Sequence, residues 1–350
     1  MDYRYKYNKY KKKYLVLKGA GNDKNKILGT LYGVCVGDAL GSRYEFLEAY
    51  KAIDKLNEDM KNNKLPLLGG GPFNFQPGQI SDDGEMTLSL LHSISTIGHY
   101  DQKDIAQKYL EWFNTKPIDY GKTIEKALFT REPSKNSTDM IENSQKLNQT
   151  SLSNGVLMRC SPIGIMALQI KKAALKEIVN QECDLTHPNP IVKDAVFIYC
   201  LAIKYAIMGM KKDELYNKLL NDITQPRVRI ILLDAMQIPE PTYLIDRNNK
   251  EIYVPTDDKE FQGYLGVALQ NTFYEFLHND NYYDSMINII KRGGDTDTNC
   301  AIAGGLLGAY YGLNNIPKEW LEMVKTANYE RANKYPFLNV NHIEKVYTSI

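Results

Sequence analysis

Apolar side chains recur at helical spacing along most of the chain. In the segment 85–97, for example, Met86 and Ile94 share one helical face. Asp101 and Asn189 are placed as N-caps of the helices that follow them. The same pattern predicts helices over 27–40, 190–208, 265–276 and 282–292, one after Asp101 and one opening at Pro317. The pattern therefore predicts an all-α fold with long functional loops.

Strand signals are sparse and lie in one place. Residues 243–245 and 252–254 flank an Asn-Asn turn and are predicted to form a hairpin. This hairpin lies within 223–260, which looks like an insertion between helices. Segments 57–80 and 130–152 are predicted to be long loops.

The composition of the 350-residue chain is that of an ordinary globular protein, with 43% hydrophobic and 24% charged residues. No apolar run reaches the roughly 18 residues that a membrane span needs, and the N-terminus has no apolar signal core. Five cysteines form no Cys-x-x-Cys pair, which indicates reduced thiols and no zinc module. We expect a cytoplasmic protein. Its Lys-, Asn-, Ile- and Tyr-rich composition is typical of a low-GC microbe or of a large DNA virus. In the viral case we expect the protein in the cytoplasm of the host.

Charge is unevenly distributed although the net charge is +1. Residues 1–18 contain seven basic residues and one acid, so the rest of the chain is mildly acidic. That balance does not favour a nucleic-acid surface and permits a cation site. We expect a flexible, Tyr/Lys-rich leader over 1–24, with a nucleic-acid or membrane-surface contact as its alternative role. Because no linker interrupts the predicted helices, we expect one domain over 25–350.

A glycine ladder marks the first predicted helix, with one face formed by Gly29, Gly33, Gly37 and Gly41. Each glycine inside a helix costs about 1 kcal/mol relative to alanine. The ladder therefore predicts a close approach of another backbone, and the small residues of 301–309 are a plausible partner. Pure helix packing explains the ladder, but it also leads through Asp38 to Glu45, which could place an acid at the mouth of a site.

Two segments combine carboxylates with hydroxyls directly before a helix. Ser81, Asp82 and Asp83 precede the helix over 85–97, and Asp295, Asp297 and Thr298 follow two glycines. Hard cations such as Mg²⁺ and Mn²⁺ prefer oxygen ligands, and neither segment offers the His or Cys typical of zinc. Six such side chains suffice for two cations that share ligands. The alternative is helix capping, by a capping box from Asp82 to Glu85 and by Asp295 or Asp297.

Two further segments are candidates for substrate contact. The turn Ser153-Asn154-Gly155 precedes Met158 and Arg159 at the start of an apolar helix, an arrangement that suits an anion. Arg159 could pair with a phosphate or with an internal carboxylate. His187 lies before another helix and could be either a ligand contact or a structural residue.

Taken in order, these segments resemble the motifs of the ADP-ribosylglycohydrolases, the type that includes the dinitrogenase-reductase-activating glycohydrolase. The matching segments are 33–41 with Glu45, 81–86, 153–159, 186–187 and 293–299. Each motif alone is weak, but their order and approximate spacing match together over about 27–312. Gly84 departs from the family pattern because it lacks the hydroxyl often found there, whereas Ser81 keeps the hydroxyl of the usual threonine. The leader and the 223–260 insertion lie outside the pattern.

The resemblance implies an orthogonally packed helical domain with two Mg²⁺ or Mn²⁺ ions in a cleft. It implies hydrolysis of the N- or O-glycosidic bond between ADP-ribose and a protein or small-molecule acceptor. The implied metal ligands are Ser81, Asp82, Asp83, Asp295, Asp297 and Thr298. Glu45 matches the mobile acid near the metals, and Glu45 and Asp83 are the candidate catalytic groups. The implied substrate contacts are Ser153, Asn154, Gly155, Met158, Arg159 and His187.

Two other functions remain open from the sequence. One is a catalytically silent ADP-ribose-binding or structural relative on the same helical body, although such a protein has no chemical need for every carboxylate. The other is a different di-metal hydrolase acting on nucleotides, which the absence of His-Asp metal pairs disfavours. The acceptor and the choice between Mg²⁺ and Mn²⁺ are open as well.

Overall fold

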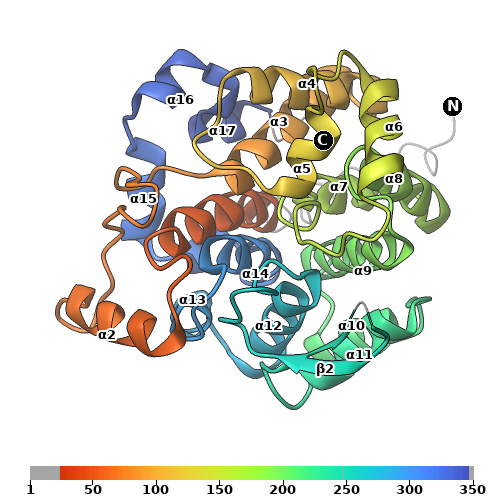
Figure 1. Ribbon diagram of the computed structural model, residues 1–350. Helices are drawn as coiled ribbons and strands as arrows, with labels where there is room; N and C mark the ends of the chain where they lie inside the picture. The colour runs from red at the N-terminus through yellow and green to blue at the C-terminus, as the bar shows by residue number, and fades with distance from the viewer. Residues whose placement is uncertain (1–23, 247, 347–350) are drawn as a thin grey trace, which may run out of the picture.

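The computed structural model describes residues 24–246 and 248–346. It is built almost wholly from helices, which confirms the all-α prediction (Figure 1). A first helix is described over residues 24–41. The α-helices that follow are α2 (Ala49–Asp59), α3 (Asp82–Ile97), α4 (Gln102–Asn114), α5 (Lys122–Leu128), α6 (Ser137–Leu147), α7 (Ser161–Met166), α8 (Lys172–Asp184), α9 (Pro190–Ile207), α10 (Lys212–Leu220), α11 (Pro226–Ala235), α12 (Leu265–His278), α13 (Tyr282–Lys291), α14 (Thr296–Tyr311), α15 (Lys318–Thr326), α16 (Glu330–Lys334) and α17 (Ile343–Val346). None of the helices in these ranges is both long and apolar enough to span a bilayer.

Short 3₁₀ turns and one hairpin complete the described elements. The turns are η1 (Ala167–Gln169), η2 (Leu313–Asn315), η3 (Pro336–Leu338) and η4 (Val340–His342). Strands β1 (Thr242–Ile245) and β2 (Glu251–Val254) pair antiparallel, with Tyr243 opposite Tyr253, as the sequence predicts. The leader prediction for 1–24 lies outside the described residues except for Lys24.

The predicted N-caps form where the sequence places them. The Asp101 carboxylate accepts from the amides of Lys103 and Asp104, and the Asn189 side chain accepts from the amide of Ile191. The loop expected over 130–152 is wrong, because α6 lies inside it. That helix buries only Ser137, Met140 and Ser144, so its apolar stripe is too narrow to show in the sequence. The expected loop over 57–80 begins only after α2 ends at Asp59.

The centre of the molecule is formed by the helix over 24–41 and by α14 (Figure 1). All residues of α14 from Thr296 to Ala309 are buried, since α9, α12 and α13 pack against it. Two buried tyrosines donate to carbonyls of this pair: Tyr199 to Ile302 O at 2.7 Å and Tyr282 to Gly33 O at 2.8 Å. One hydrophobic core extends from Leu28 to Ile343. The five cysteines within it are free and buried.

Candidate active site

The glycine ladder brings the first helix into backbone contact with α14. A Cβ added at Gly37 would lie 2.1 Å from the carbonyl oxygen of Cys300, and one at Gly41 would lie 2.3 Å from that of Thr296. The hydroxyl of Thr296 also donates to Gly41 O at 2.7 Å. The end of the first helix is therefore fixed against the start of α14, where three of the predicted metal ligands are found.

The turn before α14 depends on two glycines in the left-handed region. Gly293 has a φ of 69° and Gly294 a φ of 75°, which residues with a Cβ rarely adopt. Gly294 exchanges backbone hydrogen bonds with the segment after Glu45: its amide donates to Leu47 O at 2.8 Å and its carbonyl accepts from Phe46 N at 2.7 Å. This pairing holds Glu45 beside Asp295.

Asp295 stands at the N-cap position of α14, but its side chain caps nothing. Its carboxylate instead accepts from Asn154 Nδ2 at 2.7 Å. Asp297 lies in the first turn of the helix and is buried. The capping explanation for this pair is therefore wrong, and both carboxylates are available for another role in the site.

The turn before α3 supplies the second group of carboxylates. Its N-cap is Ser81, whose Oγ accepts from the amide of Asp83 at 3.4 Å, so the capping box from Asp82 to Glu85 does not form. Ser81 Oγ also donates to Asp83 Oδ2 at 3.0 Å, and Thr298 Oγ1 donates to the same oxygen at 3.5 Å. The Thr298 contact joins the two sequence motifs across α3 and α14.

We use the name acid cluster for Glu45, Asp82, Asp83, Asp295 and Asp297. Carboxylate oxygens of Glu45, Asp295 and Asp297 lie within 4.8 Å of one another. Burial, together with the charge of Asp295, raises the pKa of Glu45 to about 10. Burial and neighbouring carboxylates likewise raise the pKa of Asp82, Asp83 and Asp297 well above the usual value. The charges of the cluster therefore repel one another strongly in a water-poor setting.

Three oxygens of the acid cluster are buried without a hydrogen-bond partner among the described residues: Glu45 Oε2, Asp83 Oδ1 and Asp297 Oδ1. A buried carboxylate is costly unless it is paired or coordinates a cation. Divalent cations with oxygen preference would neutralise the repulsion and occupy these oxygens. The residues present therefore fit hard divalent cations.

Two acids near the cluster escaped the sequence prediction of site residues. Both oxygens of Asp38 accept from the amide of Ser81, at 2.9 and 3.0 Å, and Oδ2 accepts from the amide of Gly84 at 2.8 Å. Asp38 thus holds the turn that carries Asp82 and Asp83, and burial raises its pKa to about 7. The sequence signal was Gly37-Asp38 at the end of the glycine ladder.

Asp119 is the second missed acid. It lies in the loop between α4 and α5, and its charge raises the pKa of both Glu45 and Asp82. Burial in turn raises the pKa of Asp119, and Asp295 contributes. No motif surrounds Asp119 in the sequence, so only the fold shows that it faces the acid cluster.

The turn 153–155 lies beside the acid cluster through the bond from Asn154 to Asp295. The backbone amide of Asn154 donates to Gly263 O at 3.1 Å, so this amide is not available to bind an anion. Ser153 Oγ is 2.8 Å from Nε2 of His187. His187 is fully buried, and its Nδ1 is 2.8 Å from Thr186 Oγ1. A direct contact of His187 or the buried Met158 with substrate stays a prediction.

Arg159 is a correction to the predicted set of substrate contacts. Its side chain is fully buried and forms an ion pair with Glu182 at 2.8 Å. Nη1 donates to Gly155 O at 2.6 Å, and Nη2 donates to Thr186 Oγ1 at 2.8 Å. The internal alternative is therefore the one that the structure shows. Arg159 holds the 153–155 turn and the segment before His187 from behind.

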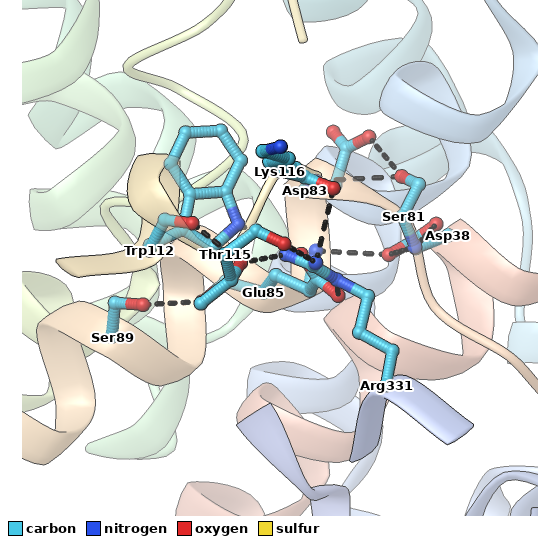
Figure 2. Close-up of polar contacts among 10 residues, drawn as sticks. Asp38, Ser81, Asp83, Glu85, Ser89, Trp112, Thr115, Lys116 and Arg331 are labelled. Carbon is cyan, nitrogen blue, oxygen red and sulfur yellow. Dashed lines mark hydrogen bonds and ion pairs between the residues drawn. The ribbon is translucent and has the colours of Figure 1, made fainter. Parts of the chain in front are cut away.

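A second ion pair, between Arg331 and Glu85, lies near the turn that carries Ser81 and Asp83 (Figure 2). Arg331 of α16 pairs with both carboxylate oxygens of Glu85, with Nη2 2.8 Å from Oε2. Trp112 Nε1 donates to the same oxygen at 2.7 Å. Arg331 also donates to the carbonyls of Thr115 and Lys116, at 3.0 and 3.3 Å. This arrangement ties the first turn of α3 to the loop that leads to Asp119.

Comparison with known proteins agrees with this geometry. The sequence profile of the ADP-ribosylglycohydrolase family matches residues 20–343. A protein of Acanthamoeba polyphaga mimivirus named as an ADP-ribosyl glycohydrolase is 33% identical, over 90% of this chain and 94% of its own length. The ADP-ribosylarginine hydrolase Tri1 of Serratia proteamaculans is 26% identical, over 85% of this chain and 75% of its own.

The fold itself has a solved counterpart. An ADP-ribosylglycohydrolase-related protein superposes with a TM-score of 0.66 at 22% identity, over 94% of this chain and 99% of the other. The matched range contains every motif that meets at the acid cluster. The chain thus belongs to the ADP-ribosylglycohydrolase family and is a hydrolase of ADP-ribosyl bonds.

Proposed function

We propose that this chain releases ADP-ribose from an arginine-linked acceptor in a reaction that depends on two divalent cations. The observation that carries the cation dependence is the acid cluster. Two motifs more than 200 residues apart bring carboxylates together beside Glu45. One oxygen each of Glu45, Asp83 and Asp297 is buried without a hydrogen-bond partner among the described residues. The family assignment supports the ADP-ribosyl bond as the one that is cleaved.

The cations, either Mg²⁺ or Mn²⁺, would be held by Ser81, Asp82, Asp83, Asp295, Asp297 and Thr298. When bound, such cations neutralise charge and lower the pKa of a coordinated water. The chain's own residues would do the rest. Asp83 would orient the attacking water and Glu45 would transfer a proton, because both carboxylates belong to the acid cluster at which that water would bind.

The reaction breaks the bond at C1″ of the ribose through an oxocarbenium-like state, as glycoside hydrolysis generally does. The 153–155 turn would hold the diphosphate, with Ser153 Oγ held by His187 and with the turn supported by Arg159. Asn154 would keep Asp295 in place through its side-chain amide.

Asp119 supports arginine as the acceptor. It adds a further carboxylate beside a cluster that already has enough acids for two cations, and it is held on a separate loop. A guanidinium is a cation that binds carboxylates with paired hydrogen bonds. The Serratia relative carries the name of an ADP-ribosylarginine hydrolase, which agrees with this acceptor.

The deciding experiment is a hydrolysis panel. Purified protein would receive arginine-, serine- and nucleobase-linked ADP-ribose with Mg²⁺, Mn²⁺ or EDTA, and mass spectrometry would detect free ADP-ribose. We expect release from the arginine linkage that EDTA abolishes. Measurable ADP-ribose binding without release on any linkage would instead indicate a silent binding protein, and a nucleotide monophosphate as the product would indicate a different di-metal hydrolase.

Three variants test the residues. Asp82→Asn and Asp297→Asn should each reduce turnover at least about 100-fold with the fold retained by circular dichroism. Near-normal turnover of either variant would refute the two-cation assignment.

Asp119→Asn should reduce kcat/KM about 10- to 100-fold on the arginine linkage, because a charged hydrogen bond is lost. The reduction on the serine linkage should be far smaller. Equal losses on both linkages would refute the acceptor assignment.

A further inference from the structure

A cavity of about 560 Å³ lies beside the active site, outside the segments that carry the predicted ADP-ribose contacts. Its walls come from the loop 74–79, the residues 115–118 that follow α4, and the segment 328–335 around α16. Ile118 lines both this cavity and a smaller hollow against Ser81, Asp82 and Asp119. The cavity therefore adjoins the acid cluster on the side of Asp119.

The charge of the cavity is opposite to that of the acid cluster. Its lining includes three basic residues, Lys116, Arg331 and Lys334, and one acid, Glu330. Arg331 is paired with Glu85, whereas Lys116, Lys334 and Glu330 are exposed, which leaves a net charge of +1 on the exposed lining. Lys334 also lies 5.4 Å from the ring centre of Tyr335, at the edge of the same cavity. Two exposed ammonium groups over a hollow of this size favour an anionic ligand.

Lys116 stands where glycine would fit the backbone better. It follows the C-cap Thr115 of α4 and has a φ of 58°, the left-handed position at which helices usually carry glycine. Lysine is not needed there as a cap, since Arg331 already donates to the carbonyls of Thr115 and Lys116. Neither the backbone conformation nor helix capping therefore explains a lysine at this position.

The position of the cavity relative to the predicted ADP-ribose contacts indicates which part of a substrate it would bind. None of its lining residues comes from 153–159 or 186–187, the segments predicted to contact ADP-ribose. It begins instead beside Asp119, the residue that we place at the acceptor. We propose that this cavity binds the acceptor polypeptide next to the modified arginine and prefers acidic side chains there. The proposal rests on the proposed function.

The test uses three ADP-ribosylated arginine peptides that differ only in the flanking residues, which are glutamate, glutamine or lysine. The wild-type protein should show a KM about three- to tenfold lower for the glutamate peptide than for the lysine peptide at 50 mM salt, with similar kcat. The preference should shrink at 0.5 M salt because exposed charges are screened. Free ADP-ribosylarginine has no flanking residues, so its turnover measures hydrolysis without any contribution from the cavity.

The double variant Lys116→Gly/Lys334→Gln should lose the preference for the glutamate peptide and keep the wild-type rate on free ADP-ribosylarginine. Its melting temperature should not fall, since glycine suits the backbone at 116. The matched control is Lys171→Gln/Lys211→Gln, which removes two exposed lysines before α8 and α10, far from α16 in Figure 1. The control should keep the preference.

The outcomes separate the two proposals. No turnover of free ADP-ribosylarginine by the wild-type protein would refute the proposed function. Normal turnover of it with equal KM for all three peptides would refute only the acceptor cavity. A preference that survives in the double variant, or a lower KM for an ADP-ribosylated oligonucleotide than for the glutamate peptide, would also refute the cavity assignment.

Discussion

Arg159 and His187 are neighbouring buried residues that their surroundings hold in different charge states. Burial lowers the pKa of Arg159, but Tyr109 and Glu182 more than compensate and leave it above the usual value, so the guanidinium is charged. Burial and then the charge of Arg159 hold the pKa of His187 well below its usual value. The imidazole is therefore neutral and can form its two contacts with hydroxyls only as a donor at one nitrogen and an acceptor at the other.

This charge state predicts a pH effect on stability. In the unfolded chain His187 takes up a proton below about pH 6.5, whereas in the folded chain it stays neutral to a much lower pH. Its contribution to the free energy of unfolding is therefore complete above pH 6.5. It decreases by about 1.4 kcal/mol per pH unit below that, until the folded-state pKa is reached.

The measurement compares wild type with His187→Gln by urea unfolding at pH 7.5, 6.5 and 5.5 in one EDTA-containing buffer. Other titrating groups largely cancel in the difference between the two proteins. The stability advantage of wild type should be constant from pH 7.5 to 6.5 and should shrink toward pH 5.5. An advantage that does not change with pH would show that His187 takes up a proton at the same pH in the folded and the unfolded chain.

At the residue scale, the sequence predicts those ligands that lie together in short motifs. Ser81, Asp82 and Asp83 stand side by side, so their shared chemistry is visible without a fold. Asp38 and Asp119 are different, because each acts on a segment distant in sequence. Arg159 could not be assigned either, since only the fold shows that Glu182 is its partner.

The first helix and α14 are in direct backbone contact. A methyl group added at a ladder glycine would therefore meet backbone atoms and not a flexible side chain that could move aside. Gly37→Ala should therefore lower the free energy of unfolding by at least about 2 kcal/mol, even after the gain of about 1 kcal/mol in helix propensity. It should also weaken activity, because the start of α14 carries Asp297.

The matched control is Gly121→Ala at the N-cap of α5, where an added Cβ would meet nothing within 4 Å. Its cost should be about 1 kcal/mol or less. Chemical denaturation measures both variants. Equal effects at the two positions would show that the ladder tolerates a methyl group and that the close contact does not hold the helices together.

The ion pair between Arg331 and Glu85 joins α16 to α3 and to the end of α4. Both side chains are largely buried, with exposures of 11% and 3%, so removing one leaves an uncompensated charge. Arg331→Met should therefore cost about 3–5 kcal/mol. The exposed pair of Lys64 and Glu319 is the control, and Lys64→Met should cost less than about 1 kcal/mol.

The double variant Arg331→Met/Glu85→Gln separates the pair from its packing. It should recover part of the loss, because the unpaired carboxylate is gone. Thermal unfolding of the single and double variants measures this coupling. A double variant less stable than Arg331→Met alone would show that Glu85 matters mainly through Trp112.

At the element scale, the sequence predicts helices with broad apolar faces, such as α9 and α12. It misses α6 and does not single out the short α16, whose buried residues are too few to form a visible stripe. These helices are held by contacts with the rest of the molecule, which no local pattern records.

The acid cluster concentrates like charges in the interior, and this affects the stability of the whole molecule. Cations that bind the folded chain alone should raise its free energy of unfolding, by about 2.7 kcal/mol at a concentration 100 times the Kd. Adding Mg²⁺ or Mn²⁺ should therefore raise the melting temperature, and EDTA should lower it. Calorimetry measures both.

Asp297→Asn provides the internal check of this prediction. In EDTA it should be at least as stable as wild type, because one buried like charge is removed. With Mg²⁺ it should be the less stable of the two, since a ligand is lost. A variant that is less stable under both conditions would show that Asp297 serves packing rather than cation binding.

At the scale of the whole molecule, periodicity is enough to predict the all-α class, whereas the arrangement of helices came only from the resemblance to a family. Periodicity reports which face of a helix is buried, not which helix covers it. The ladder at Gly29 to Gly41 is the exception, since it predicted a close backbone partner and singled out the segment 301–309.

The contact between Gly41 and Thr296 also determines when the protein can become active during its synthesis. The two residues are 255 positions apart, so at 5–20 residues per second the ribosome needs roughly 13–50 s to make the second after the first. Throughout that interval the glycine face of the first helix has no α14 to pack against, so the centre of the core cannot form. The carboxylates of the two motifs meet only after α14 emerges, so an unfinished chain has no complete site with which to capture cations.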